Sequence, residues 1–205
     1  MKVLGVGLNK TGTTTLGACL HHWGLKHTSC HREAFNLWRN DNYEEILTIA
    51  EEFDSFEDWP WPLIYKEIDE KFPNTKFILT RRINSDTWYK SLCKHAKRTG
   101  PTDFRKYIYG YEMPHQHKKE HILFYEKHLD SVREYFYERQ DNFLEVCWEE
   151  GDGWDELSSF LGFERPKIPF PHEKKSPTMG DNLKELVPSI KKSIKTSIKK
   201  TWKPN

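Results

Sequence analysis

The segment GVGLNKTGTTTL, residues 5–16, concentrates the residue types that suit the binding of an anion. An apolar strand leads into a turn rich in glycine and threonine, and the turn opens a helix that we predict from about Thr14 to Trp23. Such a turn directs several backbone N–H groups and the positive end of the helix dipole at one point, where an anion is stabilised. Threonine hydroxyls and the Lys10 ammonium add further donors. The segment therefore predicts a site for a phosphate-like group, with an ordinary helix start beside an unrelated lysine as the alternative.

The spacing of glycine and lysine argues against a nucleoside triphosphate as that ligand. The loop that binds ATP or GTP reads G-x-x-x-x-G-K-[ST], with the lysine directly after the second glycine. Gly7 and Gly12 have this separation, but Thr13 follows Gly12, and Lys10 lies two residues before it. We also find no apolar strand that ends in an aspartate placed to hold Mg²⁺, because the strand predicted at 143–147 runs into tryptophan and glutamate. A P-loop kinase that uses ATP and Mg²⁺ is thus the weaker interpretation.

Three segments of the chain carry a resemblance to a known family. Residues 10–14 read KTGTT; residues 77–82 read FILTRR and precede WYKSL at 88–92; residues 151–162 read GDGWDELSSFLG and precede PFPH at 169–172. In this order they resemble the 5′-phosphosulfate loop, the 3′-phosphate segment and the closing segment of a single-domain branch of the sulfotransferases. These enzymes use 3′-phosphoadenosine 5′-phosphosulfate (PAPS), and their P-loop-type architecture places the lysine before the glycine. The resemblance spans about residues 2–175.

The resemblance implies that the chain moves a sulfuryl group from PAPS to a hydroxyl or amine acceptor by in-line displacement, without a metal ion. Lys10 would stabilise the charge on the bridging oxygen of the leaving phosphate. The residues implied to hold the donor belong to its two binding segments: Lys10, Thr11, Gly12, Thr13, Thr14, Thr15, Arg82 and Ser91. As in phosphoryl transfer, positioning and charge stabilisation should dominate the catalysis.

The 3′-phosphate segment departs from the family pattern. Ser91 follows Arg82 by nine positions and Arg81 by ten. In the family, the serine usually follows the arginine by eight positions. A one-residue insertion within 83–87 would explain the difference. We favour Arg82 as the ligand of the 3′-phosphate, and the alternative role for either arginine is a surface ion pair.

Asp58 is the candidate general base for the acceptor. In cytosolic sulfotransferases a histidine precedes an apolar residue and a proline at the end of a comparable strand, and Asp58 stands in that place. A carboxylate of ordinary pKa is a weak base, so we expect burial beside the neighbouring tryptophans to raise the pKa of Asp58. Asp58 could instead cap the next helix, and Glu57 and Asp54 are the reserve candidates for the base.

Residues 98–122 would form a wall of the acceptor site in the sulfotransferase interpretation. Three tyrosines there suit an aromatic lining and suit a core equally well: Tyr107, Tyr109 and Tyr111. Three histidines raise a weak zinc hypothesis because two of them have the spacing of adjacent helical turns: His115, His117 and His121. Their polar neighbours favour a solvated helix start, so we expect no metal.

The C-terminal segment differs in charge from the rest of the chain. Residues 183–205 contain seven lysines and one glutamate, whereas the preceding part has 25 basic and 30 acidic residues. Four apolar residues recur every fourth position: Ile190, Ile194, Ile198 and Trp202. This pattern predicts a basic amphipathic helix, and residues 188–203 could contact an anionic membrane or pack as a frayed helix on the acidic body. A non-catalytic nucleotide-fold protein with a membrane-seeking tail is therefore a further alternative, and the acidic body argues against nucleic acid.

Composition excludes two classes of protein. The 205 residues are 31% charged with a mean hydropathy of -0.84, but 14% are aromatic, which is unlike a disordered chain. The longest uncharged stretch near the N-terminus, residues 11–25, is too short and polar to span roughly 30 Å of hydrocarbon.

The four cysteines are scattered, as is typical of free thiols in a reducing compartment. We expect a cytoplasmic protein, with peripheral membrane contact through the tail as an option.

Strands that alternate with helices predict an α/β fold, a P-loop-type three-layer sandwich with a central, mainly parallel sheet. We expect strands at residues 2–8, 25–29, 76–80 and 143–147, and a strand end within 53–59. We expect helices at residues 14–23, 42–53, 63–72, 85–97, 115–139 and 154–161. Residues 1–175 would form the sulfotransferase-like domain, and residues 176–205 the basic tail.

Overall fold

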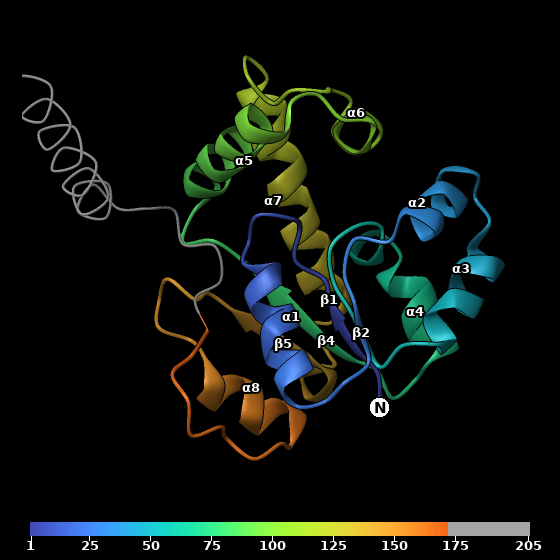
Figure 1. Cartoon of the computed structure of the whole chain (residues 1–205), viewed down its shortest axis with the longest axis vertical. Coiled ribbons are helices and arrows are strands. Elements are labelled where there is room, and N and C mark those ends of the chain that lie inside the picture. The colour runs from blue at the N-terminus through green and yellow to red at the C-terminus, as the bar shows by residue number, and fades with distance from the viewer. Residues whose placement is uncertain (172–205) are drawn as a thin grey trace, which may run out of the picture. The chain divides into compact units, whose positions relative to one another are not determined.

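Five parallel strands form the centre of the fold in the computed structural model, which describes residues 1–171 (Figure 1). The strands are β1 (Val3–Gly5), β2 (His27–Thr28), β3 (Ser55–Phe56), β4 (Lys76–Thr80) and β5 (Phe143–Val146). Their order in the sheet is β2-β3-β1-β4-β5, and every pairing is parallel. The parallel sheet predicted from the alternation of strands and helices is confirmed.

Helices cover both faces of this sheet. They are α1 (Thr13–His22), α2 (Arg32–Arg39), α3 (Tyr43–Glu51), α4 (Tyr65–Lys71), α5 (Ser85–Thr99), α6 (Asp103–Tyr109), α7 (Lys118–Tyr135) and α8 (Trp154–Leu161), with 3-10 turns η1 (Trp61–Leu63) and η2 (Gln140–Asn142). Alternate strand residues point to opposite faces, and in β4 Phe77 and Leu79 join the core under α2–α7, whereas Ile78 joins the core under α1 and α8. The two cores give the predicted three layers.

Two helices lie where none was predicted. The side chain of His31 caps α2 by accepting from the backbone N–H of Ala34 at 3.2 Å, and histidine is an uncommon capping residue. Thr102 caps α6 by accepting from the N–H of Arg105, directly after the Gly100-Pro101 break. The first strand is also shorter than predicted, because the chain leaves the sheet after Gly5.

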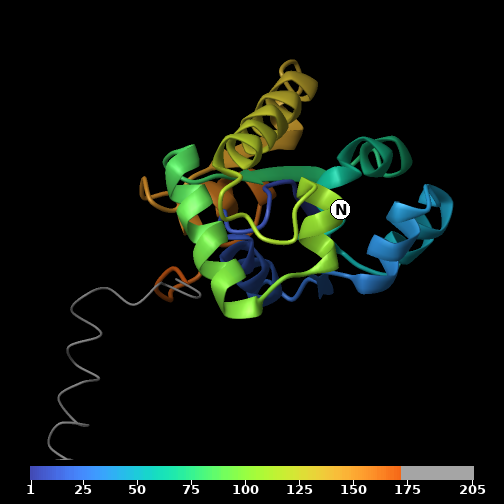
Figure 2. The ribbon, with the colours of Figure 1, turned by 90° about the horizontal axis from the view of Figure 1, so that it is seen from above.

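Helices α5 and α6 lie over the carboxyl edge of the sheet, where the loop between β1 and α1 also lies (Figures 1 and 2). No helix within residues 1–171 is long and apolar enough to cross a membrane. All four cysteines are free thiols. The basic tail, its membrane contact through residues 188–203 and the predicted domain boundary at 175 lie outside the described residues.

Candidate active site

The loop between β1 and α1 is fixed to the end of β4. Thr11 is fully buried, and its hydroxyl donates to the carbonyl of Leu8 at 2.6 Å and lies 2.6 Å from Thr80 Oγ1. Gly7 is required by close approach, since a Cβ there would lie 2.1 Å from Thr80 Oγ1 and 2.3 Å from the Thr80 carbonyl oxygen. The side chain of Thr11 therefore shapes the loop, and its hydroxyl is already used within the protein.

Helix α1 begins at a residue that has no side chain to cap it. Gly12 is the N-cap residue, at a φ of 97°, and a Cβ there would lie 2.4 Å from the ring of Trp148. Trp148 Nε1 donates to the Gly12 carbonyl at 3.2 Å. Thr13 and Thr15 are buried, whereas Thr14 is exposed. The uncapped N–H groups of the first turn, together with Thr14, are the donors that α1 presents at this edge.

Helices α5 and α6 hold the loop from above (Figure 2). Trp88 Nε1 donates to the carbonyl of Asn9, and the Tyr109 hydroxyl donates to Asn9 Oδ1, both at 2.9 Å. Burial, with a further contribution from the charge of Asp58, raises the pKa of Tyr109 well above its ordinary value, so the phenol remains a donor. Ser91 is partly exposed and lies one turn beyond Trp88 on α5.

Lys10 adopts a backbone conformation that lysine rarely takes. Its φ is 72°, in the left-handed region, and its side chain is partly buried. Its carbonyl oxygen accepts from Arg82 Nη1 at 3.4 Å. A non-glycine residue in this region costs about 1 kcal/mol, which the contacts of the surrounding loop must offset. The loop is therefore held in a defined shape around its one lysine.

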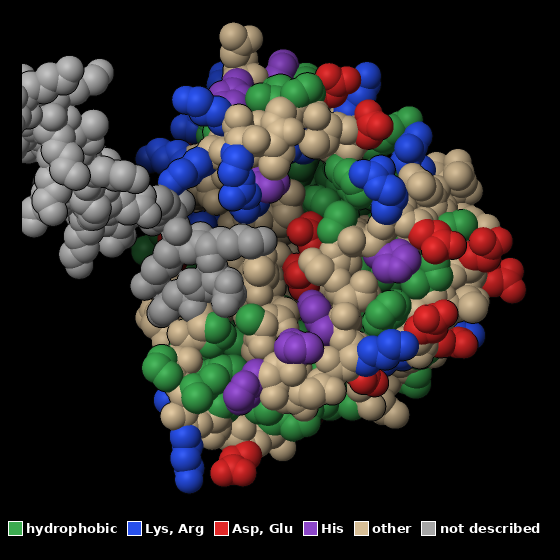
Figure 3. Space-filling view, viewed as in Figure 1, with side chains coloured by type: hydrophobic (Ala, Val, Ile, Leu, Met, Phe, Trp, Pro, Cys, Tyr) green, Lys and Arg blue, Asp and Glu red, His purple; other side chains and the backbone are tan. Residues whose placement is uncertain are grey.

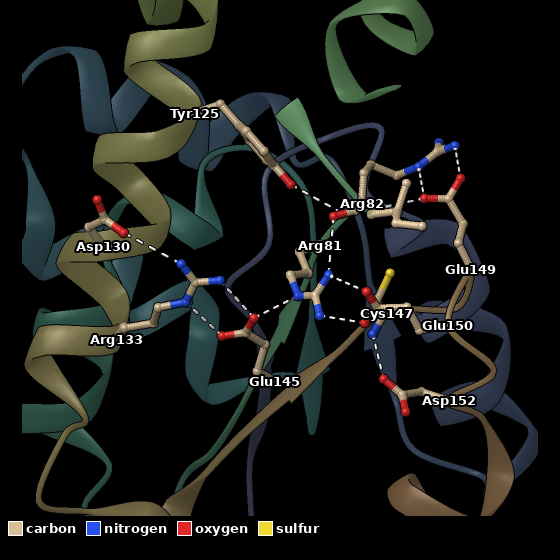
Figure 4. Close-up of polar contacts among 11 residues, drawn as sticks. Arg81, Arg82, Tyr125, Asp130, Arg133, Glu145, Cys147, Glu149, Glu150 and Asp152 are labelled. Carbon is tan, nitrogen blue, oxygen red and sulfur yellow. Dashed lines mark hydrogen bonds and ion pairs between the residues drawn. The ribbon is translucent and has the colours of Figure 1, made fainter. Parts of the chain in front are cut away.

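The two arginines after β4 have different partners (Figure 4). Arg82 donates from Nε and Nη2 to Glu149, at 3.0 and 2.5 Å, and its backbone N–H donates to the Tyr125 hydroxyl at 3.1 Å. Its third guanidinium nitrogen makes the contact with Lys10. Arg82 thus links the predicted 3′-phosphate segment to the predicted 5′-phosphosulfate loop.

Arg81 belongs to a chain of ion pairs that connects α7, β5 and the segment after β5 (Figure 4). It donates to Glu145 at 2.7 Å and to Glu150 at 2.5 Å, and Arg133 donates to both oxygens of Glu145. Burial alone would raise the pKa of Glu145, but hydrogen bonds from Arg133 and Arg81 hold it below its ordinary value. Both arginines therefore make the ion pairs of the alternative interpretation, and Arg82 is the one that also contacts the loop.

Asp58 follows β3, which lies next to β1 in the sheet. It is partly buried beside Trp59 and Trp61, at a φ of 64°, and its Oδ1 accepts from the Trp59 N–H at 2.9 Å. Asp58 is not the N-cap residue of η1 or α4, which are Pro60 and Ile64, but its backbone carbonyl accepts from the N–H of Trp61 at the start of η1, at 3.0 Å. Because β3 is parallel to β1, the residues that follow the two strands lie at the same edge of the sheet, which places Asp58 at the edge of the loop that carries Lys10.

The two reserve carboxylates lie in different places. Glu57 is buried; its Oε1 accepts from Ser29 Oγ at 2.5 Å and lies 3.9 Å from His27 Nε2, and among residues 1–171 its Oε2 has no hydrogen-bond partner. A Cβ on Gly5 would lie 3.0 Å from Glu57 Cβ, so this carboxylate is beside the end of β1. The strand end predicted within 53–59 is confirmed as β3, and Glu57 and Asp58 follow it directly. Asp54 precedes β3 and bonds the N–H of Lys26, at the opposite edge of the sheet, so it is not retained as a base.

The wall predicted at residues 98–122 includes one tyrosine that reaches the loop, Tyr109. Tyr107 is exposed and stacks on Arg39 at 3.6 Å, away from the loop. His121 is buried rather than solvated, which corrects the expectation for this helix start, and its Nδ1 bonds the carbonyl of His117 at 2.7 Å. Burial lowers the pKa of His121. Within residues 1–171, no group of three or more side chains could hold a metal ion.

Several contacts around the loop come from residues that no motif pointed to. Trp148 and Glu149 follow β5, and His128 on α7 bonds the carbonyl of Val6 at 2.7 Å. The space-filling view shows a hollow at the centre of this face, below α5 and α6, with acidic side chains inside it (Figure 3). The site is thus an open edge of the sheet lined by both signs of charge.

A parallel sheet whose central strand runs through a glycine- and threonine-rich loop into a helix is an α/β fold of P-loop type. The chain belongs to the sulfotransferase family, because the family model described as a sulfotransferase domain matches residues 2–114 and 102–179. No curated protein matches the chain. Sulfotransferases transfer a sulfuryl group to hydroxyl or amine acceptors, which gives the general class of reaction.

Proposed function

We propose that the protein transfers a sulfuryl group from PAPS to a hydroxyl or amine acceptor by in-line displacement at the carboxyl edge of the sheet. The observation that carries this proposal is the contact between Arg82 and the carbonyl of Lys10. It joins two segments that lie 72 positions apart and that the resemblance assigns to the two phosphate-bearing ends of one donor. The contact is with the backbone of Lys10, so it supports the proposal by bringing the two segments within reach of a single bisphosphate ligand.

The 5′ end of the donor is bound by the loop and the start of α1. The first-turn N–H groups after Gly12 and the exposed Thr14 hydroxyl supply uncharged donors to the 5′-phosphate. Lys10 supplies a positive charge. This charge stabilises the bridging oxygen most strongly as the bond between that oxygen and sulfur breaks. The buried Thr11, Thr13 and Thr15 keep the loop and the helix start in shape.

The 3′-phosphate is bound by Arg82 and Ser91. Arginine matches a phosphate well, because its planar fork donates two parallel hydrogen bonds. Helix α5 begins three residues after Arg82, with Asn84 as its N-cap, and carries Ser91. A one-residue insertion within 83–87, where β4 connects to the start of α5, would account for the difference from the family spacing.

Asp58 is the general base in this proposal. It follows the strand next to β1, and the ring of its neighbour Trp59 packs edge-on against Tyr109 at 5.9 Å. Glu57 faces the α1 side of the sheet and already shares its Oε1 with Ser29. Glu57 is buried whereas Asp58 is partly exposed, and this difference in accessibility favours Asp58 as the carboxylate that takes the proton of the acceptor.

Transfer of label from [³⁵S]PAPS in the presence of EDTA tests the proposal. With a panel of phenols, sugars, amines and tyrosine peptides as acceptors, we expect a labelled product and an equal amount of 3′-phosphoadenosine 5′-phosphate. Phosphate transfer from ATP and Mg²⁺ to the same panel, without transfer from PAPS, would instead identify a kinase.

A further inference from the structure

The carboxylate of Glu149 lies in a cradle of three converging donors (Figure 4). Arg82 Nη2 donates to Oε1 at 2.5 Å, and Arg82 Nε donates to Oε2 at 3.0 Å. The backbone N–H of Ile83 also donates to Oε2, at 2.9 Å. The end of β4 therefore presents a preformed anion site, and an acidic side chain of the same chain fills it.

This ion pair is exposed enough to exchange. The side chains of Arg82 and Glu149 are 25% and 33% exposed, respectively. Burial raises the pKa of Glu149, but bonds from Arg82 and Ile83 outweigh this and hold it below its ordinary value, so the group is an anion near neutral pH. An ion pair that water reaches contributes little net stability and is readily replaced by a stronger anion.

The neighbouring ion pair provides a contrast within the same structure. Arg81 is shared between Glu145 and Glu150, and Glu145 is in turn held by Arg133 (Figure 4). Exchange at Arg81 would break its bonds to two carboxylates, one of which Arg133 also holds, whereas exchange at Arg82 displaces a single carboxylate. The two consecutive arginines are therefore built for different tasks.

A phosphate monoester suits the Arg82 cradle better than a carboxylate does. It carries close to two negative charges near pH 7 and three acceptor oxygens, which match a guanidinium fork and an adjacent backbone N–H. Because the same guanidinium contacts the carbonyl of Lys10, an anion at Arg82 lies next to the loop. The occupant must then leave before a phosphate can bind.

We propose that Glu149 is an internal competitor of the donor's 3′-phosphate at Arg82, and so determines how strongly the site prefers a 3′,5′-bisphosphate to a 5′-monophosphate. This inference rests on the proposed function. The apparent affinity for the bisphosphate is the intrinsic affinity multiplied by the fraction of molecules in which the carboxylate does not occupy Arg82. When the carboxylate returns to Arg82, it speeds release of the bisphosphate product.

The test compares Glu149→Gln with Glu150→Gln, a matched change at the next residue, whose partner is Arg81. Calorimetry measures the Kd of 3′-phosphoadenosine 5′-phosphate and of AMP for each protein. We expect Glu149→Gln to bind the bisphosphate about two- to fivefold more tightly, a range set by the modest free energy of an exposed ion pair. The Kd of AMP should stay unchanged, and Glu150→Gln should resemble the unaltered protein for both ligands.

The outcomes separate this inference from the proposed function. If the unaltered protein binds the bisphosphate but Glu149→Gln binds it equally or more weakly, Glu149 positions Arg82 and the competition is overturned. If the unaltered protein does not bind the bisphosphate, the proposed function fails and the inference fails with it. Glu149 is exposed, so we expect its replacement to leave folding intact, and the melting temperature of the variant checks this. Glu149→Ala repeats the binding measurement with a side chain that cannot accept a hydrogen bond from Arg82.

Discussion

Replacement of Lys10 by alanine is expected to lower the rate of sulfuryl transfer from PAPS by about 10²- to 10³-fold, the usual cost of removing one preorganised group that stabilises developing charge. The leaving bisphosphate gains negative charge as the sulfur–oxygen bond breaks, and Lys10 is the lysine of the loop that faces this position in our proposal. Single-turnover kinetics with saturating PAPS would measure the effect on the chemical step, separately from binding.

The Lys10 variant should remain folded. Alanine at a φ of 72° carries the same backbone strain as lysine, so the free energy of unfolding should change little, whereas Lys10→Gly should stabilise the protein by up to about 1 kcal/mol. Lys127→Ala, an exposed change on α7, is the matched control and should keep full activity. Wild-type turnover by Lys10→Ala would remove the loop lysine from the mechanism.

Replacement of Asp58 by asparagine is expected to lower kcat by about 10²- to 10⁴-fold, the range for loss of a general base. The change keeps the size of the side chain and an oxygen that can accept from Trp59 N–H, so the turn after β3 should persist. Steady-state kinetics with saturating PAPS measures the loss. Turnover by Asp58→Asn at the rate of the unaltered enzyme would contradict the role of Asp58 as the base.

Glu57→Gln is the comparison that identifies the base. Glu57 is buried and bonded to Ser29, so we expect its replacement to lower the melting temperature clearly and to lower kcat only slightly. If Glu57→Gln abolishes turnover at unchanged stability while Asp58→Asn does not, then Glu57 is the base. Comparison of the two variants shows which of these adjacent carboxylates is the base, a choice that the sequence alone does not make.

The elements that the sequence predicts best are those whose local pattern and tertiary role agree. KFILT reads as a buried strand and forms β4, because alternate residues enter the two cores on opposite faces of the sheet. The turn at Gly12 opens α1 within one residue of the predicted start, since a glycine at positive φ favours a change of direction there. The family resemblance likewise rests on short contiguous segments, and the sulfotransferase-domain match confirms it.

The contacts that the sequence could not predict join residues that only the fold brings together. Glu149 meets Arg82 across 67 positions, and Trp148 meets Gly12 across 136, because β5 lies beside β4 in the sheet. No spacing in the sequence encodes these pairs. Two-residue strands such as β3 are also too short to show a clear period, so the sequence predicts a strand end within 53–59 but not which strands pair with it.

The central claim is that one site binds a nucleotide with phosphates at both its 3′ and 5′ positions, without a metal ion. Calorimetric titration with 3′-phosphoadenosine 5′-phosphate in EDTA, beside a titration with ATP and Mg²⁺, tests it most directly. We predict micromolar binding of the bisphosphate, weakened about tenfold or more by either Lys10→Ala or Arg82→Ala, and weak binding of ATP. Tight binding of ATP with Mg²⁺ and no response to the bisphosphate would contradict this account.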